Sequence, residues 1–175
     1  MTLKFLLLGA SHSDFYLANA IKEFGYELYT SGNYADGLTN CIADKYIPAD
    51  YSDFQSCLNA IKGVDFDFIL PSANDFSYLT TCKINDYISS MSYLDNHEIS
   101  LIIHRKDLFR SLCKQLSLSS PKLYAILSDR RAYPDNIKFP CVIKPVDLTG
   151  GKGVYIAKNT SDLQNYLLNY LRILI

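Results

Sequence analysis

The sequence predicts an α/β fold in which a Rossmann-like layer of mostly parallel strands is followed by a smaller α+β region. In the first part, short uninterrupted apolar runs alternate with amphipathic segments, which is the order expected of a doubly wound sheet. Nearer the C-terminus, two strand-like segments flank a glycine-rich turn, a pattern that favours antiparallel pairing. We therefore expect two domains, residues 1–103 and residues 104–175.

The first domain opens with a strand, a helix and a second strand. Residues 3–8 read LKFLLL, a run typical of a strand buried on both faces, and Gly9 ends it. Apolar side chains then recur near helical spacing through residues 14–25, where Gly25 can close the helix. YELYT, residues 26–30, supplies the second strand. This order begins a doubly wound layer.

The same alternation continues to the end of the first domain. The expected elements are a short helix (34–45), a strand (45–49), a helix (53–62), a buried strand (66–71), a helix (75–91) and a last strand (99–104). Because most of these strands are separated by helices, we expect them to pair in parallel.

The second domain combines a strongly amphipathic helix with an antiparallel sheet. The helix is expected over residues 105–116, and residues 122–128 alternate like a strand. FPCVIKPV (139–146) and GVYIAK (153–158) form two further strands around a glycine loop. Ser161 is expected to cap a helix that runs to the C-terminus.

Composition excludes several classes of function. Nearly half of the 175 residues are hydrophobic and a fifth are charged, as in ordinary soluble proteins. The formal net charge of −1 leaves no electrostatic footprint for nucleic acid or an acidic membrane surface. No stretch approaches the roughly 20 apolar residues of a membrane helix. We expect a cytoplasmic protein with no nucleic-acid or membrane partner.

Cysteine usage supports the same compartment. The number of cysteines is odd and none are spaced as CxxC, which argues against a disulfide framework and against a zinc site. We therefore expect reduced thiols, mostly in the core, and no metal ligands or nucleophile among them. The five are Cys41, Cys57, Cys82, Cys113 and Cys141.

The glycine loop is the most informative motif. Glycines allow a backbone to approach phosphate oxygens closely, and lysines supply charge for the same oxygens. The pattern differs from a Walker A loop, because the lysine is followed by glycine and then by a strand. A hairpin turn explains the loop pattern equally well. The loop consists of Thr149, Gly150, Gly151, Lys152 and Gly153.

Two other lysines are candidates for the same anion. Lys144 ends an apolar strand, where its ammonium must reach solvent or meet an anion. Lys106 opens a helix, where a positive charge opposes the macrodipole at a cost of about 0.3–1 kcal/mol. By local pattern alone, an ordinary solvated lysine is the favoured interpretation of each.

Polar residues follow two strands of the first domain. Ser11 and His12 come after the first strand, and Asn74 and Asp75 follow FDFILP. Since ligands bind at the carboxyl ends of strands in α/β sheets, these four residues are candidates for substrate contact. Helix capping by neighbouring polar side chains is the competing interpretation. A GxGxxG motif is absent, which argues against a nicotinamide or flavin cofactor.

Taken together, the chain resembles the N-terminal half of an ATP-grasp enzyme, such as carbamoyl phosphate synthase, biotin carboxylase or the purine-pathway members. The resemblance implies a Rossmann-like pre-ATP-grasp domain followed by the first α+β subdomain of an ATP-grasp domain. The segments that carry it are LLLGASHSDFYLANAIKEFGYELYT, ADKYIPADYSD, FDFILPSANDF, HRKDLFRSLCKQLSLSSPKLYAI and, most specifically, KFPCVIKPVDLTGGKGVYIAKN.

The resemblance implies ATP as the ligand and gives each basic residue a role. Lys106 matches the first lysine that contacts the ATP phosphates. Lys144 matches the lysine that contacts phosphate and the adenine side. Residues 149–153 match the loop that closes over the β- and γ-phosphates.

The family's remaining half carries its magnesium-binding and catalytic residues, and no counterparts occur in residues 155–175. We therefore expect a truncated N-terminal fragment of an ATP-dependent carboxylate–amine or related ligase. We expect no catalytic or metal-binding residues in it and no activity alone, with Mg²⁺ bound only when the other half is present. The expected partners are a separate C-terminal half or a second copy of the chain, and a small carboxylate substrate. The alternative is a non-catalytic module that binds a small metabolite or nucleotide.

Overall fold

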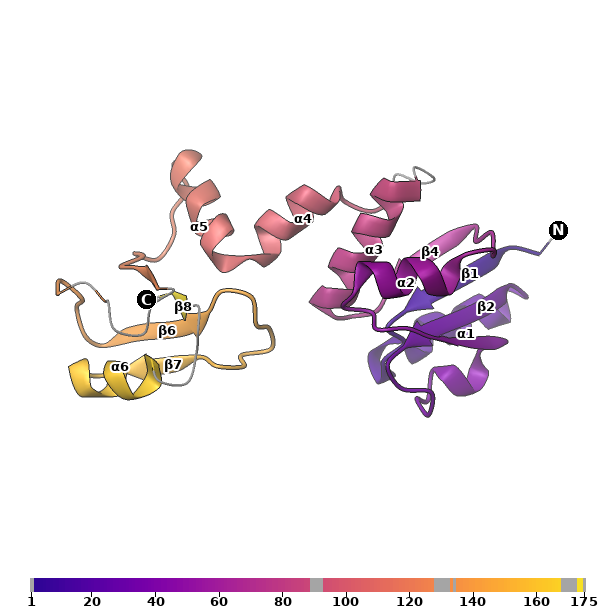
Figure 1. Ribbon diagram of the computed structural model, residues 1–175, viewed down its shortest axis with the longest axis horizontal. Coiled ribbons are helices and arrows are strands. Elements are labelled where there is room, and N and C mark those ends of the chain that lie inside the picture. The colour runs from indigo at the N-terminus through magenta and orange to yellow at the C-terminus, as the bar shows by residue number, and fades with distance from the viewer. Residues whose placement is uncertain (1, 89–92, 128–132, 134, 168–172, 175) are drawn as a thin grey trace. The chain divides into compact units, whose positions relative to one another are not determined.

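The computed structural model describes residues 2–88, 93–127, 133, 135–167 and 173–174. The chain divides into two compact units, Met1–Ser100 and Leu101–Ile175 (Figure 1). The predicted domain boundary, after residue 103, lies three residues beyond this division. Both positions fall within the helix His97–His104.

Four parallel strands form the described sheet of the first unit, as the sequence predicts. They are β1 (Lys4–Leu8), β2 (Glu27–Gly32), β3 (Lys45–Pro48) and β4 (Phe68–Pro71). Their spatial order is β3-β2-β1-β4, and each neighbouring pair is parallel. Leu8 lies opposite Ser31 of β2 and Pro71 of β4. Because this register aligns the carboxyl ends of the strands, the loops that follow them lie at one edge of the sheet.

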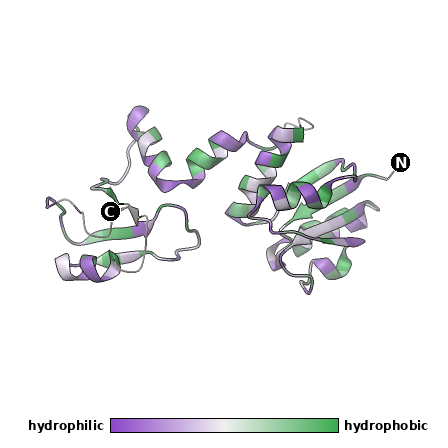
Figure 2. Ribbon diagram, viewed as in Figure 1, coloured by the Kyte–Doolittle hydropathy of each residue, from purple (hydrophilic) through white to green (hydrophobic). Residues whose placement is uncertain are grey.

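Helices cover both faces of this sheet. The helical elements are η1 (a 3-10 turn, His12–Asp14), α1 (Phe15–Glu23), α2 (Phe54–Ile61) and α3 (Asp75–Ile88). Leu6 and Leu8 pack with residues of α2 and α3, whereas Leu7 packs with residues of α1. This alternation follows from the two-residue period of a strand. Figure 2 shows the helices banded in both hydropathy colours, as expected of segments that bury one face.

The helix predicted for residues 34–45 is wrong. The described helical structure in this segment is limited to a 3-10 turn, η2 (Asn40–Ile42). The side-chain amide of Asn40 donates to the carbonyls of Tyr34 and Ala35, at 2.8 and 3.1 Å. Asparagine side chains that bond the backbone in this way compete with helical hydrogen bonds, so the apolar spacing of the segment was a misleading signal.

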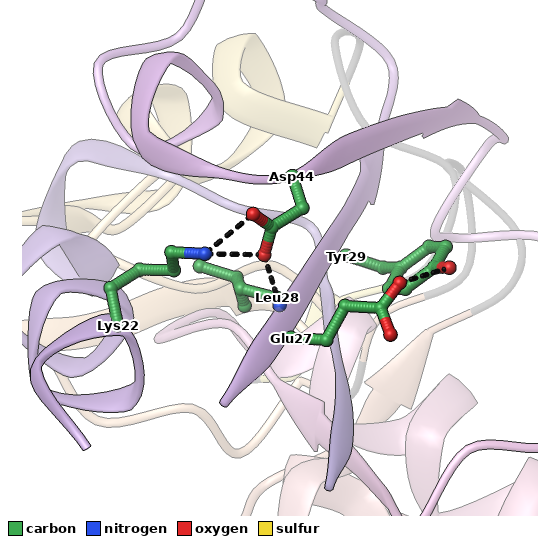
Figure 3. Close-up of polar contacts among 5 residues, drawn as sticks. All are labelled: Lys22, Glu27, Leu28, Tyr29 and Asp44. Atoms are coloured by element: carbon green, nitrogen blue, oxygen red, sulfur yellow. Dashed lines mark hydrogen bonds and ion pairs between the residues drawn. The ribbon is translucent and has the colours of Figure 1, made fainter. Parts of the chain in front are cut away.

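Asp44 ties the end of this irregular segment to its neighbours. Both of its carboxylate oxygens lie 2.5 Å from the Lys22 ammonium, and one also accepts the Leu28 N–H at 2.8 Å (Figure 3). Beside it, the Tyr29 hydroxyl donates to Glu27 at 2.7 Å (Figure 3). The carboxylate therefore links α1, β2 and the start of β3 through polar contacts.

The strand predicted for residues 99–104 is also wrong, because this run lies in a helix, α4 (His97–His104). The Asn96 side chain accepts the backbone N–H groups of Glu98 and Ile99 at 2.9 and 3.4 Å, which is the role of a helix N-cap. Ile99 is 55% exposed, so the apolar run is not the buried strand that its composition suggested. Short apolar runs fit helix and strand equally well.

Beyond α4, the described part of the second unit contains two helices and a four-stranded antiparallel sheet. Its elements are α5 (Lys106–Gln115), β5 (Ile126–Leu127), β6 (Cys141–Pro145), β7 (Tyr155–Ala157), α6 (Thr160–Leu167) and β8 (Ile173–Leu174). The strand order is β5-β8-β6-β7, with antiparallel pairs throughout. Ile143 and Ala157 of the hairpin pack on Leu163 and Leu167 of α6, and all four are buried. The predicted α+β character is confirmed.

The C-terminal helix differs from its prediction at both ends. Asn159, not Ser161, caps it, since its side chain accepts the Asp162 N–H at 2.9 Å. The helix is described as far as Leu167, and β8 near the C-terminus pairs between β5 and β6. Residues 168–172 lie outside the described residues, as do the ends of the elements predicted for 75–91 and 122–128.

The described helices include none that is both long and apolar enough to cross a membrane. All five cysteines are free, and only Cys41 is exposed. Burial, followed by the nearby charges of Asp50 and Asp53, raises the pKa of Cys57 to about 12. That thiol is therefore protonated at neutral pH and behaves as a core residue.

Candidate functional site

The glycine loop connects β6 to β7 and is built from two overlapping turns. Lys152 N–H donates to Thr149 O at 3.2 Å, and Val154 N–H donates to Gly151 O at 3.3 Å. Gly150, Gly151 and Gly153 have φ angles of +62°, +74° and +66°. Only glycine adopts such angles at little cost, so the backbone conformation itself requires these residues.

The tip of the loop stands free of the core. A Cβ added at Gly150 or Gly151 would meet no atom within 4 Å, and residues 150–152 are exposed. Across the described residues, no acceptor receives a hydrogen bond from the amides of Gly150, Gly151 or Gly153. Unbonded amides in a left-handed turn form the concave donor arrangement that binds anions.

The far end of the loop is fixed by an aromatic pair. The Tyr166 hydroxyl of α6 donates to Gly153 O. Its ring stacks on Tyr155 of β7, with centroids 5.2 Å apart. The loop therefore returns to the sheet at a defined position, while its tip remains unpacked.

Lys106 is held against the near end of the loop by two contacts. Its backbone N–H donates to Val146 O at 3.0 Å, and its ammonium donates to Leu148 O. The two carbonyls accept hydrogen bonds from the N–H and the ammonium of Lys106 at the start of α5. These bonds offset the unfavourable position of a positive charge at a helix N-terminus. The contacts place Lys106 directly beside the segment that leads into the loop.

An ion pair fixes the helix start around Lys106. Arg105 donates to both carboxylate oxygens of Asp107, at 2.9 and 2.5 Å, and Asp107 is 5% exposed. Burial favours the neutral carboxyl, but bonding to the guanidinium and to backbone N–H groups outweighs this, so the pKa of Asp107 is lowered. The first turn of α5 is therefore rigidly defined.

Arg110 joins the two predicted lysines and was missed in the sequence. It follows Lys106 by four residues in α5, so the two side chains share one face of the helix. Burial, followed by the positive charges of Arg110 and Lys106, lowers the pKa of Lys144. Three cations thus lie within electrostatic reach of one another. The four-residue spacing was the signal that could have identified Arg110.

A pocket of about 370 Å³ opens beside these cations. Its charged lining residues are Arg110, Lys122 and Lys144, and its lining contains no acidic residue. The Lys122 ammonium lies 4.7 Å from the ring centroid of Tyr124, which also lines the pocket. The apolar Val142, 50% exposed, completes one wall beside Lys144. The pocket is suited to an anion that carries a flat or apolar group.

The four substrate candidates of the first unit are only partly brought together. The side chains of Ser11 and Asn74 both bond to Ser72, at 3.3 and 3.2 Å. His12 is exposed, and among the described residues its side chain takes no part in the hydrogen bonds of this group. Asn74 rather than Asp75 caps α3, because its Oδ1 accepts the Ser77 N–H at 2.9 Å.

A larger pocket, of about 560 Å³, lies in the first unit but contains none of the predicted site residues. It is lined largely by apolar side chains of α2, α3 and the approach to β4, including Leu58, Phe66 and Ile88. The concentration of cations favours the smaller pocket as the chemical site.

The comparisons with known proteins agree with the expected resemblance. No protein-family model matches the chain. The formate-dependent phosphoribosylglycinamide formyltransferase of a Nitratiruptor species is 25% identical over 167 residues, covering 93% of this chain and 42% of that protein. Its counterpart in Methanocaldococcus jannaschii is 23% identical over 166 residues, with the same coverage.

Solved structures give the same fold over nearly the whole chain. The L-amino acid ligase from Bacillus licheniformis has a TM-score of 0.80 at 13% identity and covers 99% of this chain. The N5-carboxyaminoimidazole ribonucleotide synthetase from Thermotoga maritima has a TM-score of 0.70 at 20% identity, also over 99%. This chain spans 43% and 45% of those chains.

These relatives are ATP-grasp enzymes, so the predicted resemblance and the predicted fold class are confirmed. The chain spans about two-fifths of the length of the curated relatives it matches, in their N-terminal part.

Proposed function

We propose that this chain supplies the triphosphate-binding part of an ATP-dependent carboxylate–amine or related ligase. The observation that carries the proposal is the convergence of Lys106, Arg110 and Lys144 beside a glycine loop with unbonded amides. A cluster of like charges is unfavourable in the free chain, and a polyanion removes that cost. ATP carries such a polyanion attached to a flat base.

Each group has a distinct role in this proposal. The amides of Gly150, Gly151 and Gly153 close over the terminal phosphates, and the Lys152 side chain adds a charge there. Lys144 and Lys106 contact phosphate oxygens from the base of the loop. Arg110 adds a planar donor from the same helical face as Lys106.

In this proposal, the residues that bind magnesium and the second substrate lie outside this sequence. Within the described residues, no group of His, Cys, Asp or Glu side chains could hold a metal ion. A segment equivalent to the remainder of the relatives, in the same or another polypeptide, would supply those ligands. The names of the relatives specify formate and phosphoribosylglycinamide, and we extend to this chain only a small carboxylate as substrate.

ATP titration of the ¹⁵N-labelled chain tests the proposal. We expect the amide resonances of residues 149–153 to shift saturably, with a dissociation constant on the order of 1 mM, because one wall of the site is missing. Lys144→Gln and Arg110→Gln should each weaken binding roughly tenfold or more, the value of one charge-assisted hydrogen bond.

Lys114→Gln is the matched control, since it removes the same charge from the last turn of α5 and leaves the pocket lining intact. Unmoved loop resonances, or an equal loss in the control, would contradict the proposal. Tight binding of a metabolite to Met1–Ser100 without a response to ATP would favour the alternative of a non-catalytic binding module.

A further inference from the structure

The carboxyl-terminal edge of the first sheet is where α/β proteins ordinarily bind ligands, and anions are held there by free backbone N–H groups after the strands. In this chain, the loops after β1 and β4 present such groups at Ser11 and Ala73. Whether they are available to a ligand depends on what already accepts their hydrogen bonds.

The carboxylate of Asp14 accepts hydrogen bonds from both of these N–H groups. Its Oδ2 receives the Ser11 N–H, the Ser11 hydroxyl and the Ser72 hydroxyl, each at 2.6 Å. Its Oδ1 receives the Ala73 N–H at 2.9 Å. Asp14 is 4% exposed. Two donors come from the loop after β1 and two from the loop after β4, so the carboxylate lies between adjacent strand ends.

The backbone brings these two loops unusually close. Gly9 has φ +98°, and a Cβ added there would lie 2.8 Å from Ser72 Cβ. Its N–H donates to Ser31 O of β2 at 2.6 Å. Glycine at this position therefore lets the first loop approach the fourth strand until one carboxylate bridges both.

Acidic side chains outnumber basic ones at this edge. The loops after the four strands cover residues 9–14, 33–39, 49–53 and 72–75, and they contain no lysine or arginine. His12 is their one basic side chain. Their acidic residues are Asp14, Asp36, Asp50, Asp53 and Asp75. An incoming anion would meet repulsion in addition to donors that are already occupied.

We propose that Asp14 is a built-in anion that closes this edge to phosphate and carboxylate groups, so that any substrate bound there presents a neutral or amine-bearing group. Helix capping alone accounts for the contacts with Ser11. It does not account for the Ser72 hydroxyl and the Ala73 N–H, which belong to another strand's loop. The inference is independent of the phosphate site in the second unit.

The test is an anion titration of the whole ¹⁵N-labelled 175-residue chain with phosphate and with formate, at ionic strength matched with sodium chloride. In the wild type, the Ser11 and Ala73 amides should not shift saturably. In Asp14→Ala, both amides should shift saturably with each anion, with a dissociation constant on the order of 10 mM. The thermal midpoint of that variant should rise with anion concentration by more than that of the wild type.

Asp36→Ala is the matched control, because it removes an equal charge from an exposed position at the same edge and should create no anion response at Ser11 or Ala73. Saturable shifts of these two amides in the wild type would overturn the proposal. So would a folded Asp14→Ala variant without them. If that variant does not fold, the wild-type titration decides, and Asp14→Asn provides an isosteric second variant. Failure of the ATP proposal would register at residues 149–153 instead, so the two outcomes are distinguishable.

Discussion

Lys144 carries its charge in an unfavourable setting in the free chain. Burial is the largest cause, and the charges of Arg110 and Lys106 add to it, so its pKa lies below the ordinary value of 10.5. The unfolded chain binds this proton more strongly than the folded one. Protonated Lys144 therefore lowers the free energy of unfolding at pH values below its pKa in the folded chain. This loss disappears as the pH rises to about the pKa of the same group in the unfolded chain.

Replacing Lys144 by methionine should stabilise the ligand-free chain, by about 0.5 kcal/mol at pH 7, because the uncompensated charge is removed. The gain should shrink as pH approaches 10.5. Urea unfolding followed through the amide resonances of β6, between pH 7 and pH 10.5, measures both effects. Lys114→Met should show no comparable gain. A gain independent of pH would mean that removal of the positive charge is not its cause.

At the residue scale, the sequence points to those parts of the candidate site that local pattern can reveal. Lys144 and the glycine loop stand out because charge and flexibility interrupt apolar strands. Arg110 looks like an ordinary polar residue of an amphipathic helix, and only tertiary packing brings it toward Lys144. Asp14 likewise looks like a helix cap, since its contacts with Ser72 and Ala73 cross 58 and 59 residues of sequence.

At the scale of elements, β4 is one of the two edge strands of the described sheet, and a side chain bonds its backbone at Ile69. The Tyr93 hydroxyl accepts the Ile69 N–H at 2.8 Å and donates to Ile69 O at 2.7 Å. One phenol thus takes the place of a neighbouring strand at this residue. Unpaired strand edges promote association between chains, so this contact protects the edge.

Tyr93→Phe should destabilise the first unit by about 1–3 kcal/mol, because both backbone groups of Ile69 lose their partner with little change in shape. Urea unfolding gives the free energy, and hydrogen exchange of the Ile69 amide should accelerate. Tyr16→Phe is the control, since that side chain is 84% exposed. Unchanged exchange at Ile69 would show that water replaces the phenol without loss.

Element prediction succeeded where an apolar run was both short and bounded by turn residues. The run before Gly9 became β1, and FDFILP contains β4. Prediction failed where a side chain overrode the pattern. The Asn96 side chain starts α4 in a run that resembles a strand, and the Asn40 side chain disrupts an expected helix. Capping bonds of this kind depend on one residue and leave hydrophobic periodicity unchanged.

For the whole molecule, the proposed chemistry requires more than this chain. We expect no ATP hydrolysis by the chain alone, because the phosphates lack the metal ions that neutralise them. Adding the C-terminal remainder of a relative such as the Nitratiruptor enzyme, fused or in trans, together with Mg²⁺ and formate, should produce measurable phosphate release. Lys144→Gln should abolish most of it.

The control for this reconstitution is the same remainder mixed with the Lys114→Gln chain, which should behave as the wild type. Equal phosphate release with and without this chain would show that the remainder acts independently. Such a result would leave the chain as a fold without a catalytic contribution.

Lys106 is attached twice to the segment before the glycine loop, through its backbone N–H to Val146 O and its ammonium to Leu148 O. This double attachment limits which part of the loop can move. The strand end cannot drift from the start of α5 without breaking both contacts, while Tyr166 anchors Gly153 at the other side. Any movement of the loop is thereby confined to the few residues between these two attachments. Under the proposed function, the nucleotide would enter and leave by displacement of the loop tip alone.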